Sequence, residues 1–181
     1  MYCTKCGSLL TKKFLKMEGM IHFCPFCNEY VFEKTNVAVS MIILNPEETK
    51  MLYIKQYGTG KFRLVAGYTN KGESLEHTVY REMGEEIGRY PASIEFNMSK
   101  YFEPSNTLIA NYICKLTSMD VFPNEEIDEY EWIDLEDAQA KINHAKLAKI
   151  FVNEYFNKKI KKWELITFIF CALYDKIRLR V

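Results

Sequence analysis

Residues 67–88 read GYTNKGESLEHTVYREMGEEIG, and this is the most informative stretch of the chain. It places a group of acidic residues and one arginine between glycines at fixed intervals. Apolar residues recur every four positions from Leu75 to Ile87, which predicts a helix with one buried stripe. Ser74 directly precedes that helix and is a favourable N-cap residue.

Three glutamates of the predicted helix, Glu82, Glu85 and Glu86, fall within an arc of about 100° beside the apolar stripe. Carboxylates held this close together repel one another unless a cation neutralises them. Hard oxygen ligands of this kind suit Mg²⁺ or Mn²⁺, which also bind substrate phosphates. The alternative is a solvated acidic helix face, which is what most glutamate-rich helices are.

The full pattern is G-x5-E-x7-R-E-U-x-E-E-x-G, with U aliphatic, and it resembles the Nudix box at every specified position from Gly67 to Gly88. Nudix proteins are mostly hydrolases of a nucleoside diphosphate linked to another group, so the resemblance implies metal-dependent cleavage of a pyrophosphate. It also implies an α/β/α sandwich with the box helix and a C-terminal helix on opposite faces. One departure lies just past the box, where Arg89 occupies a position that is usually aliphatic.

A second pattern lies near the start of the chain, where two C-x2-C pairs are separated by 17 residues: Cys3 with Cys6, and Cys24 with Cys27. This spacing is typical of a four-thiolate zinc site. A disulfide framework fits less well because no signal peptide is visible. A thioredoxin-like redox pair fits less well because this short stretch cannot supply a βαβ unit. We expect a small structural zinc ribbon over residues 1–34.

The composition fits one compact domain with an appendage, since 48% of the 181 residues are hydrophobic. The 24 acidic and 24 basic residues cancel, so no broad positive surface for nucleic acid is predicted. No apolar run is long enough to span a bilayer and no targeting segment is visible, so we expect a cytoplasmic protein. Cys114 and Cys171 lie in apolar runs and are expected in the core.

The rest of the chain predicts an α/β fold. Apolar and alternating runs predict strands at residues 37–44, 51–55, 94–98, 108–116 and 130–133. Helical stretches are expected from Leu135 and from about His144 to Asn157. Residues 56–61 contain a Gly-Thr-Gly-Lys string that lacks the full P-loop pattern and is expected to be a plain loop. We expect the Nudix domain to comprise residues 35–157.

The C-terminal segment, residues 158–181, is apolar from Trp163 to Tyr174 and is flanked by lysines and arginines. Twelve apolar residues are too few to cross a bilayer, so a helix buried against protein is expected. Because the enzymes that this chain resembles form dimers, we expect this helix to contact a second copy in a homodimer. Association with a membrane surface is the weaker alternative.

A four-cysteine ribbon directly before a Nudix domain resembles the NADH pyrophosphatase branch of the family. Ala66-Gly67-Tyr68 is similar to the Ala-Gly-Phe that precedes the box in that branch, which implies that the Ala66 carbonyl helps to hold metal. Residues 99–108, SKYFEPSNTL, lie where the branch carries S-Q-P-W-P-F-P-x-S-L, but the glutamine and three prolines are missing. The resemblance therefore indicates the reaction more firmly than the substrate. The candidate substrate-binding residues are Phe32, Lys100, Tyr101, Phe102, Asn106 and Thr107.

The resemblance also implies a metal-binding glutamate outside the box, and Glu126 in the acidic segment 125–129 is our candidate. The alternative for the segment 125–129 is a solvated acidic loop. The alternative for Tyr101 and Phe102 is that they fill the core next to a strand. The candidate catalytic residues are Arg81, Glu82, Glu85 and Glu86, and the candidate Mg²⁺ or Mn²⁺ ligands are Ala66, Glu82, Glu85, Glu86 and Glu126. Arg81 is expected to orient Glu82 or Glu73, and either Glu85 or Glu82 is the expected base.

The expected reaction is cleavage of NADH or NAD⁺ to NMN(H) and AMP. ADP-ribose, FAD and the NAD cap at an RNA 5′ end contain the same kind of bond and stay open as substrates. A different class of function is also open, because zinc ribbons bind nucleic acid or protein and a Nudix domain can serve as a nucleotide-binding module. An intact carboxylate trio argues against that non-catalytic alternative.

Overall fold

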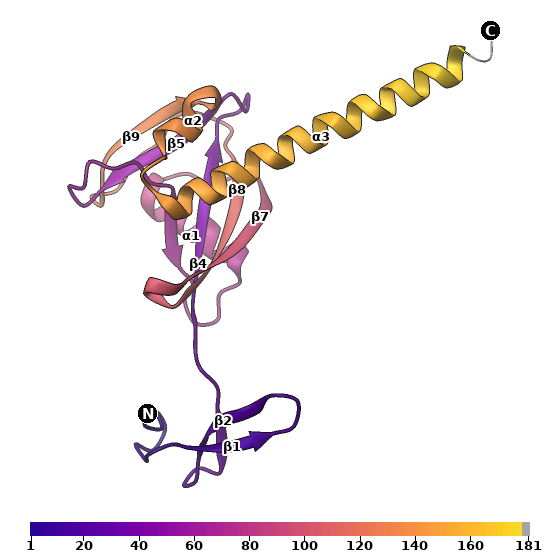
Figure 1. Cartoon of the computed structure of the whole chain (residues 1–181). Coiled ribbons are helices and arrows are strands. Elements are labelled where there is room, and N and C mark those ends of the chain that lie inside the picture. Colours follow the sequence, from indigo (N-terminus) through magenta and orange to yellow (C-terminus); the bar gives the residue numbers. More distant parts are fainter. Residues whose placement is uncertain (179–181) are drawn as a thin grey trace. The chain divides into compact units, whose positions relative to one another are not determined.

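The computed structural model describes residues 1–178, with side chains placed for all of these except Trp163 and residues 165–178. The chain divides into two compact units, Met1–Thr35 and Asn36–Val181. Figure 1 labels their helices and most of their strands.

The N-terminal unit is a three-stranded antiparallel sheet of β1 (Thr11–Leu15), β2 (Gly19–Cys24) and β3 (Glu29–Val31), in that order. Its buried core consists of Cys3, Leu10 and Cys24. A unit of this size rarely buries enough apolar surface to fold on its core alone, so we expect its cysteines to contribute to its stability.

The second unit is built on a six-stranded mixed sheet. Its strands are β4 (Asn36–Leu44), β5 (Lys50–Gln56), β6 (Val65–Tyr68), β7 (Ser93–Phe102), β8 (Thr107–Lys115) and β9 (Ile127–Asp134). The order is β7-β8-β4-β5-β9, with β6 also pairing with β4. The pairing of β4 with β8 is parallel and all other pairings are antiparallel. Central β4 is buried from Ala38 to Leu44 because both faces of the sheet are covered.

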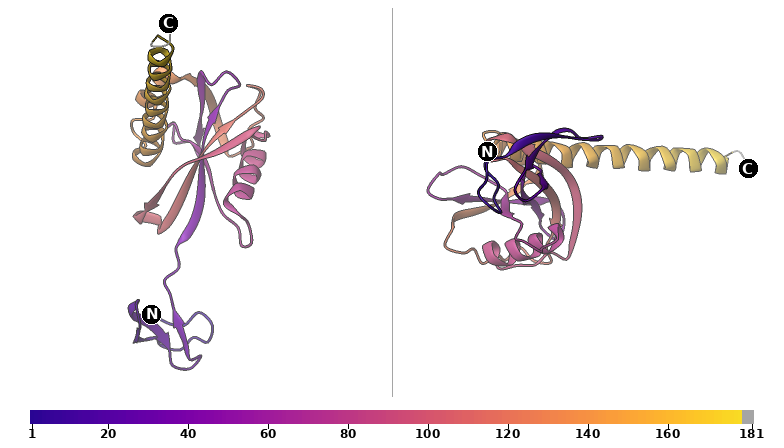
Figure 2. Two further views of the ribbon diagram at one scale, coloured as in Figure 1. Left: turned by 90° about the vertical axis from the view of Figure 1, so that its right-hand side faces the viewer. Right: turned by 90° about the horizontal axis from the view of Figure 1, so that it is seen from below.

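Two helices cover these faces, as Figure 2 shows in its left view. Helix α1 (Leu75–Ile87) lies on one face and α3 (Lys146–Arg178) on the other, while short α2 (Leu135–Lys141) follows β9. Alternate residues of β4 point to opposite faces. Val39, Met41 and Ile43 join the core beneath α1, and Ile42 and Leu44 join the core beneath α3. The predicted α/β/α sandwich is therefore confirmed.

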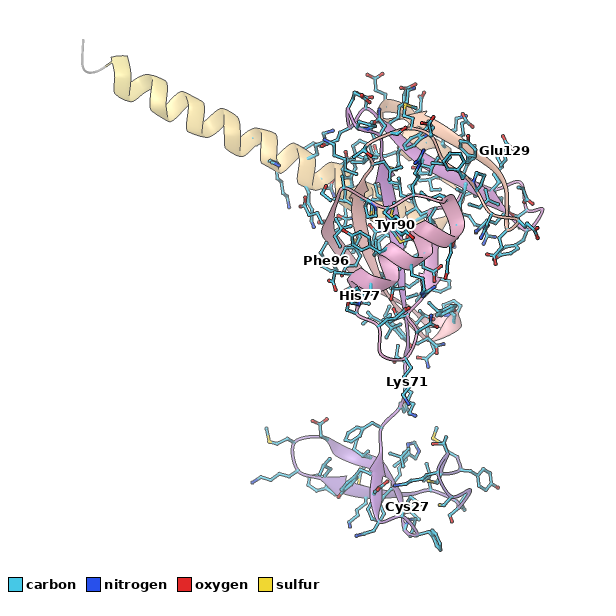
Figure 3. The ribbon with its side chains drawn as sticks, turned by 180° about the vertical axis from the view of Figure 1, so that it is seen from behind. Cys27, Lys71, His77, Tyr90, Phe96 and Glu129 are labelled. Carbon is cyan, nitrogen blue, oxygen red and sulfur yellow. The ribbon has the colours of Figure 1, made fainter. Side chains whose placement is uncertain are left out.

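Helix α1 has the bounds predicted from the sequence. The Ser74 side chain accepts a hydrogen bond from the His77 N–H, which caps the first turn. Gly88 ends the helix with φ of 61°, and a Cβ at this position would lie 2.9 Å from the Phe122 Cβ. The helix turns its apolar stripe to the sheet and its opposite side, which carries His77, to solvent (Figure 3).

A bulge in β7 departs from the predicted pattern. Strict alternation would place Ile94, Phe96 and Met98 on one face, but the register shifts between Phe96 and Met98. As a result Ile94 packs beneath α1 and Met98 beneath α3. The inserted Asn97 is buried and donates hydrogen bonds of 2.9 Å to the Asn111 Oδ1 and to the Phe151 carbonyl. These two partners stabilise the bulge, and neither is near it in the sequence.

Helix α3 is continuous through residue 158, where the sequence suggested a separate C-terminal segment. The predicted burial of the stretch Trp163–Tyr174, and the core position of Cys171, lie outside the described side chains. Cys114 is fully buried, as predicted. Over the part of the chain that the structure describes, none of the helices combines the length and the apolar character needed to span a bilayer.

Candidate active site and metal centre

A cavity of about 920 Å³ lies beside the sheet, between the end of α1 that carries the box glutamates and the first turn of α3. Most of its wall is apolar, formed by side chains that include Phe62, Leu64, Ile109, Leu147 and Phe151. One end is polar and is lined by Ala66, Arg81, Glu82, Glu86 and Glu126. The cavity therefore joins an apolar compartment to a group of carboxylates.

Glu82 and Glu86 are both buried, with 9% and 5% of their surfaces exposed. Burial, followed by the charges of Glu82 and Glu126, raises the pKa of Glu86 to about 8. Burial also raises the pKa of Glu82. The Gln56 amide donates a buried hydrogen bond of 3.0 Å to the Glu86 carboxylate. These groups disfavour their own negative charge in the metal-free state, so a divalent cation fits among them.

Arg81 joins the carboxylates of the box. Its Nη1 donates to Glu82 Oε1 at 2.7 Å and to Glu85 Oε2 at 2.9 Å. Its Nε donates to Glu73 Oε1 at 2.7 Å, and its Nη2 to the Tyr68 carbonyl at 2.8 Å. The bond from Arg81, together with a backbone N–H, lowers the pKa of Glu73 to about 2. One guanidinium thus fixes the loop before α1 and the position of Glu82.

Gly67 leaves the space in which the Glu82 carboxylate lies. A Cβ at position 67 would be 1.8 Å from the Glu82 Cδ and 2.0 Å from its Oε1. The φ of Gly67 is not in the left-handed region, so close approach is the reason for glycine here.

Glu126, outside the box, reaches the same cavity from the segment before β9. The Tyr57 hydroxyl donates to its Oε2 at 3.0 Å. Nearby, the Gly58 N–H donates to Asp128 Oδ2 at 2.7 Å. These two bonds connect the loop after β5 to the acidic segment, and they place Glu126 within electrostatic range of Glu86.

The other candidate residues divide between the cavity and its surroundings. Phe102 and Thr107 line the cavity, whereas Lys100, Tyr101 and Asn106 do not. Tyr101 and Phe102 are neighbours on β7, so their side chains point to opposite faces of the sheet. The Tyr101 hydroxyl donates a hydrogen bond of 2.8 Å to Asn106 Oδ1, so the side chains of Tyr101 and Asn106 bind each other.

Glu85 also lies outside the cavity wall. Glu85 is not part of the lining, and 58% of its side chain is exposed while it binds Arg81. Phe32 belongs to the N-terminal unit, and a role for it in substrate binding stays a prediction.

Several lining residues were not singled out from the sequence. Tyr57 and Lys61 come from the loop after β5, where glycines at 58 and 60 were the only signal. Lys61 ends the Gly-Thr-Gly-Lys string, so this loop contributes to the site without being a P-loop. His144 Nε2 lies 3.1 Å from the Phe62 carbonyl and connects the start of α3 to that loop.

The four cysteines of the N-terminal unit form a compact cluster, which includes Cys27 (Figure 3). Their sulfur atoms all lie within 4.8 Å of one another. The Lys5 N–H points to the Cys3 sulfur at 3.4 Å, and the Cys27 N–H to the Cys24 sulfur at 3.3 Å. Four soft thiolate donors at this spacing fit a tetrahedral zinc ion. Among the placed side chains, the box carboxylates do not form a cluster as tight as this, and Glu82 and Glu85 are hydrogen-bonded to Arg81.

Comparison with curated proteins finds distant relatives. The NAD-capped RNA hydrolase NudC of Chromobacterium violaceum is 24% identical over 132 residues, which are 72% of this chain and 50% of that protein. The protein of the same description from Pseudomonas aeruginosa strain LESB58 is 21% identical over 159 residues, covering 87% of this chain and 56% of the relative. The chain spans about half the length of the curated relatives it matches.

Solved structures agree on the fold. A NUDIX hydrolase from Nitrosomonas europaea superposes with a TM-score of 0.59 at 24% identity, covering 86% of this chain and 92% of that one. The NUDIX domain of Shewanella oneidensis NrtR, complexed with ADP ribose, gives a TM-score of 0.57 at 16% identity, covering 75% and 93%. A family model described as NUDIX domain matches residues 34–154, which are 121 of the 181 residues. The chain therefore belongs to the NUDIX domain family.

Proposed function

We propose that this protein is a metal-dependent pyrophosphohydrolase that cleaves a nucleoside diphosphate linked to another group. The observation that carries the proposal is the pair of buried glutamates, Glu82 and Glu86, at the polar end of a largely apolar cavity. A cation held there would lie next to space large enough for a nucleotide.

The metal-binding residues are the Ala66 carbonyl, Glu82, Glu86 and Glu126, which all line the polar end of the cavity. When bound, Mg²⁺ or Mn²⁺ supplies positive charge that offsets the charge of the pyrophosphate and of the departing phosphate. Arg81 orients Glu82 through its 2.7 Å hydrogen bond. A carboxylate accepts the proton of the attacking water, and Glu82 or Glu85 is our candidate for this base. Glu85 would also have to leave Arg81 to serve as a ligand.

The substrate we favour is NADH or NAD⁺, cleaved to NMN(H) and AMP. The volume of the cavity and its aromatic wall, which includes Phe62, Phe102 and Phe151, suit a dinucleotide with two flat rings. ADP-ribose and FAD share the same linkage and are alternatives.

The NAD cap of an RNA 5′ end is a second candidate substrate. The observation that favours it is the description of the curated relatives as NAD-capped RNA hydrolases. Turnover of free NADH compared with that of NAD-capped RNA distinguishes the two.

The N-terminal unit, in this proposal, binds one structural zinc ion through Cys3, Cys6, Cys24 and Cys27. A closed four-thiolate site leaves no coordination position for substrate, so zinc has no part in catalysis.

The experiment is a screen of NADH, NAD⁺, ADP-ribose, FAD and NAD-capped RNA with Mg²⁺ or Mn²⁺, on the wild type and two variants. Glu86→Gln keeps the size of the side chain but removes the charge that holds metal, so turnover should fall at least about 100-fold. Glu76→Gln is the matched control, because Glu76 lies on the same helix but outside the cavity wall, and its turnover should stay normal. Failure to cleave any of these substrates would favour the nucleotide-binding module instead.

A further inference from the structure

A second cavity, of about 380 Å³, lies beneath the middle of α3 and shares no lining residue with the first. We refer to it as the lysine cavity, because four lysines line it: Lys115 of β8 and Lys158, Lys159 and Lys162 of α3. Its acidic lining residues are Glu48 and Glu95. Four positive groups thus face two negative ones, in a chain whose net charge is zero.

The phase of α3 explains why these lysines converge. Phe151 and Tyr155 belong to the stripe that packs on the sheet. Lys158 and Lys162 continue that stripe, since helix positions three and four apart lie on one face. Lys161, in the same run of the sequence, points elsewhere and does not line the cavity. Lysines that served only to keep the helix solvated would be spread around its axis. Of the four lysines between residues 158 and 162, three line the same cavity.

The positive charge in the lysine cavity is only partly compensated. Glu48 accepts a hydrogen bond of 2.8 Å from Lys115, and this bond, with the charges of Lys115, Lys159 and Lys162, lowers the pKa of Glu48. The single carboxylate of Glu48 therefore compensates the charges of three lysines, Lys115, Lys159 and Lys162. Among the side chains that the structure places, Lys162 has no ion pair, and neither has Glu95.

The other two lysines have neutral partners. The Lys158 ammonium donates to the Asn97 carbonyl, and the Lys159 ammonium lies 3.4 Å from the Tyr155 hydroxyl. Like charges brought together in a hollow repel one another, and an anion in that hollow would remove the repulsion.

We infer that the lysine cavity is a binding site for a phosphate-bearing anion, separate from the hydrolytic site. Ammonium groups bind phosphate as compact point charges with several donors. The volume is sufficient for pyrophosphate or a nucleoside monophosphate and too small for a whole dinucleotide. The phosphate can belong to a free small molecule or to the backbone of an RNA chain. This inference does not depend on which substrate the enzyme cleaves.

The test is anion binding by the full-length protein without added divalent metal, measured by titration calorimetry and by the shift in melting temperature. The probes are pyrophosphate, AMP and a five-nucleotide RNA with a 5′ hydroxyl. The two cavities share no lining residue, so binding that is lost in variants of the lysine cavity is assigned to that cavity and not to the first. The variants are Lys159→Gln/Lys162→Gln and, as a matched control, Lys161→Gln.

We expect at least one probe to bind and to raise the melting temperature of the wild type and of Lys161→Gln. The double variant should bind about 10- to 100-fold more weakly, since it loses two charge-assisted contacts. Without any anion it should melt no lower than the wild type, because removing lysines relieves repulsion. If its fold is impaired, the single variant Lys162→Gln, at an exposed position, gives the same comparison.

The probe that binds identifies the source of the phosphate. Binding of pyrophosphate or AMP assigns a small molecule, and binding of the RNA alone assigns a nucleic-acid backbone. The inference is overturned if none of the three probes binds the wild type. It is equally overturned if the double variant binds them as tightly as the wild type does.

Discussion

Replacing Gly67 with alanine should separate catalysis from folding in this protein. The new Cβ would lie 1.8 Å from the Glu82 Cδ, whereas ordinary contact begins at 3.4 Å. The Glu82 carboxylate must therefore move by about 1.6 Å, the difference between those distances. Because it is the far end of a flexible side chain, it can rotate away without displacing backbone.

The substitution should cost little stability but much catalytic activity. Moving Glu82 breaks its 2.7 Å bond with Arg81, but Arg81 keeps its bonds to Glu73 and Glu85. The expected loss of stability is about 1–2 kcal/mol, the value of one charged hydrogen bond. Catalysis should suffer far more, since a 1 Å misplacement in an active site costs about 100-fold in rate.

The assay combines turnover over a range of Mg²⁺ concentrations with thermal unfolding. Gly84→Ala is the control, because its Cβ would meet only the Tyr90 ring, at 2.8 Å, and Tyr90 is an exposed residue that follows the C-terminal end of α1 (Figure 3). This control should keep normal activity. Turnover and Mg²⁺ dependence of Gly67→Ala close to those of the wild type would refute the reasoning, since Glu82 would then not be needed in this place.

Three further predictions concern stability and assembly. The folded pKa of Glu86, about 8, lies above its ordinary value of 4.5, so the metal-free protein should lose stability as pH rises between these values. Glu86→Gln should remove that loss, so at pH 8 its free energy of unfolding should exceed that of the metal-free wild type by about 2–4 kcal/mol. Near pH 4.5, the ordinary pKa of the group, the two free energies should converge. A difference of the same size at every pH would contradict this prediction. Protein purified without chelator should contain one zinc ion per chain by elemental analysis, and Cys24→Ser should lower stability and solubility before activity; an absence of zinc would show the cysteine assignment to be wrong. Removing residues 160–181 should give a monomer by light scattering or a poorly soluble protein, while a truncated chain that stays dimeric and soluble would show that the segment is dispensable.

The sequence was sufficient for those features that depend on neighbouring residues. Helix α1 has its predicted bounds because its cap, its apolar period and its terminal glycine all lie within the box. The box also placed Glu82 and Glu86 on one side of the helix. The fold class followed from the box and from the order of the predicted strands.

Features that depend on distant partners could not be predicted. The bulge at Asn97 depends on Asn111 and on the Phe151 carbonyl, which come from β8 and α3. The contacts of Gln56 with Glu86 and of Tyr57 with Glu126 join segments 30 and 69 residues apart. Lys100 and Tyr101 were chosen by position in a signature, and only the actual course of β7 shows that they lie outside the cavity.

The parallel pairing of β4 with β8 has a consequence for biosynthesis. Val37 pairs with Leu108, so β4 must wait for about 70 further residues to be translated before that edge is filled. At about 5–20 residues per second, the ribosome needs about 4–14 s to deliver them. β5 and β6 can pair with β4 earlier, but along its other edge. During this interval a strand with seven consecutive buried residues has one open edge, and an open edge of this kind can pair with other chains.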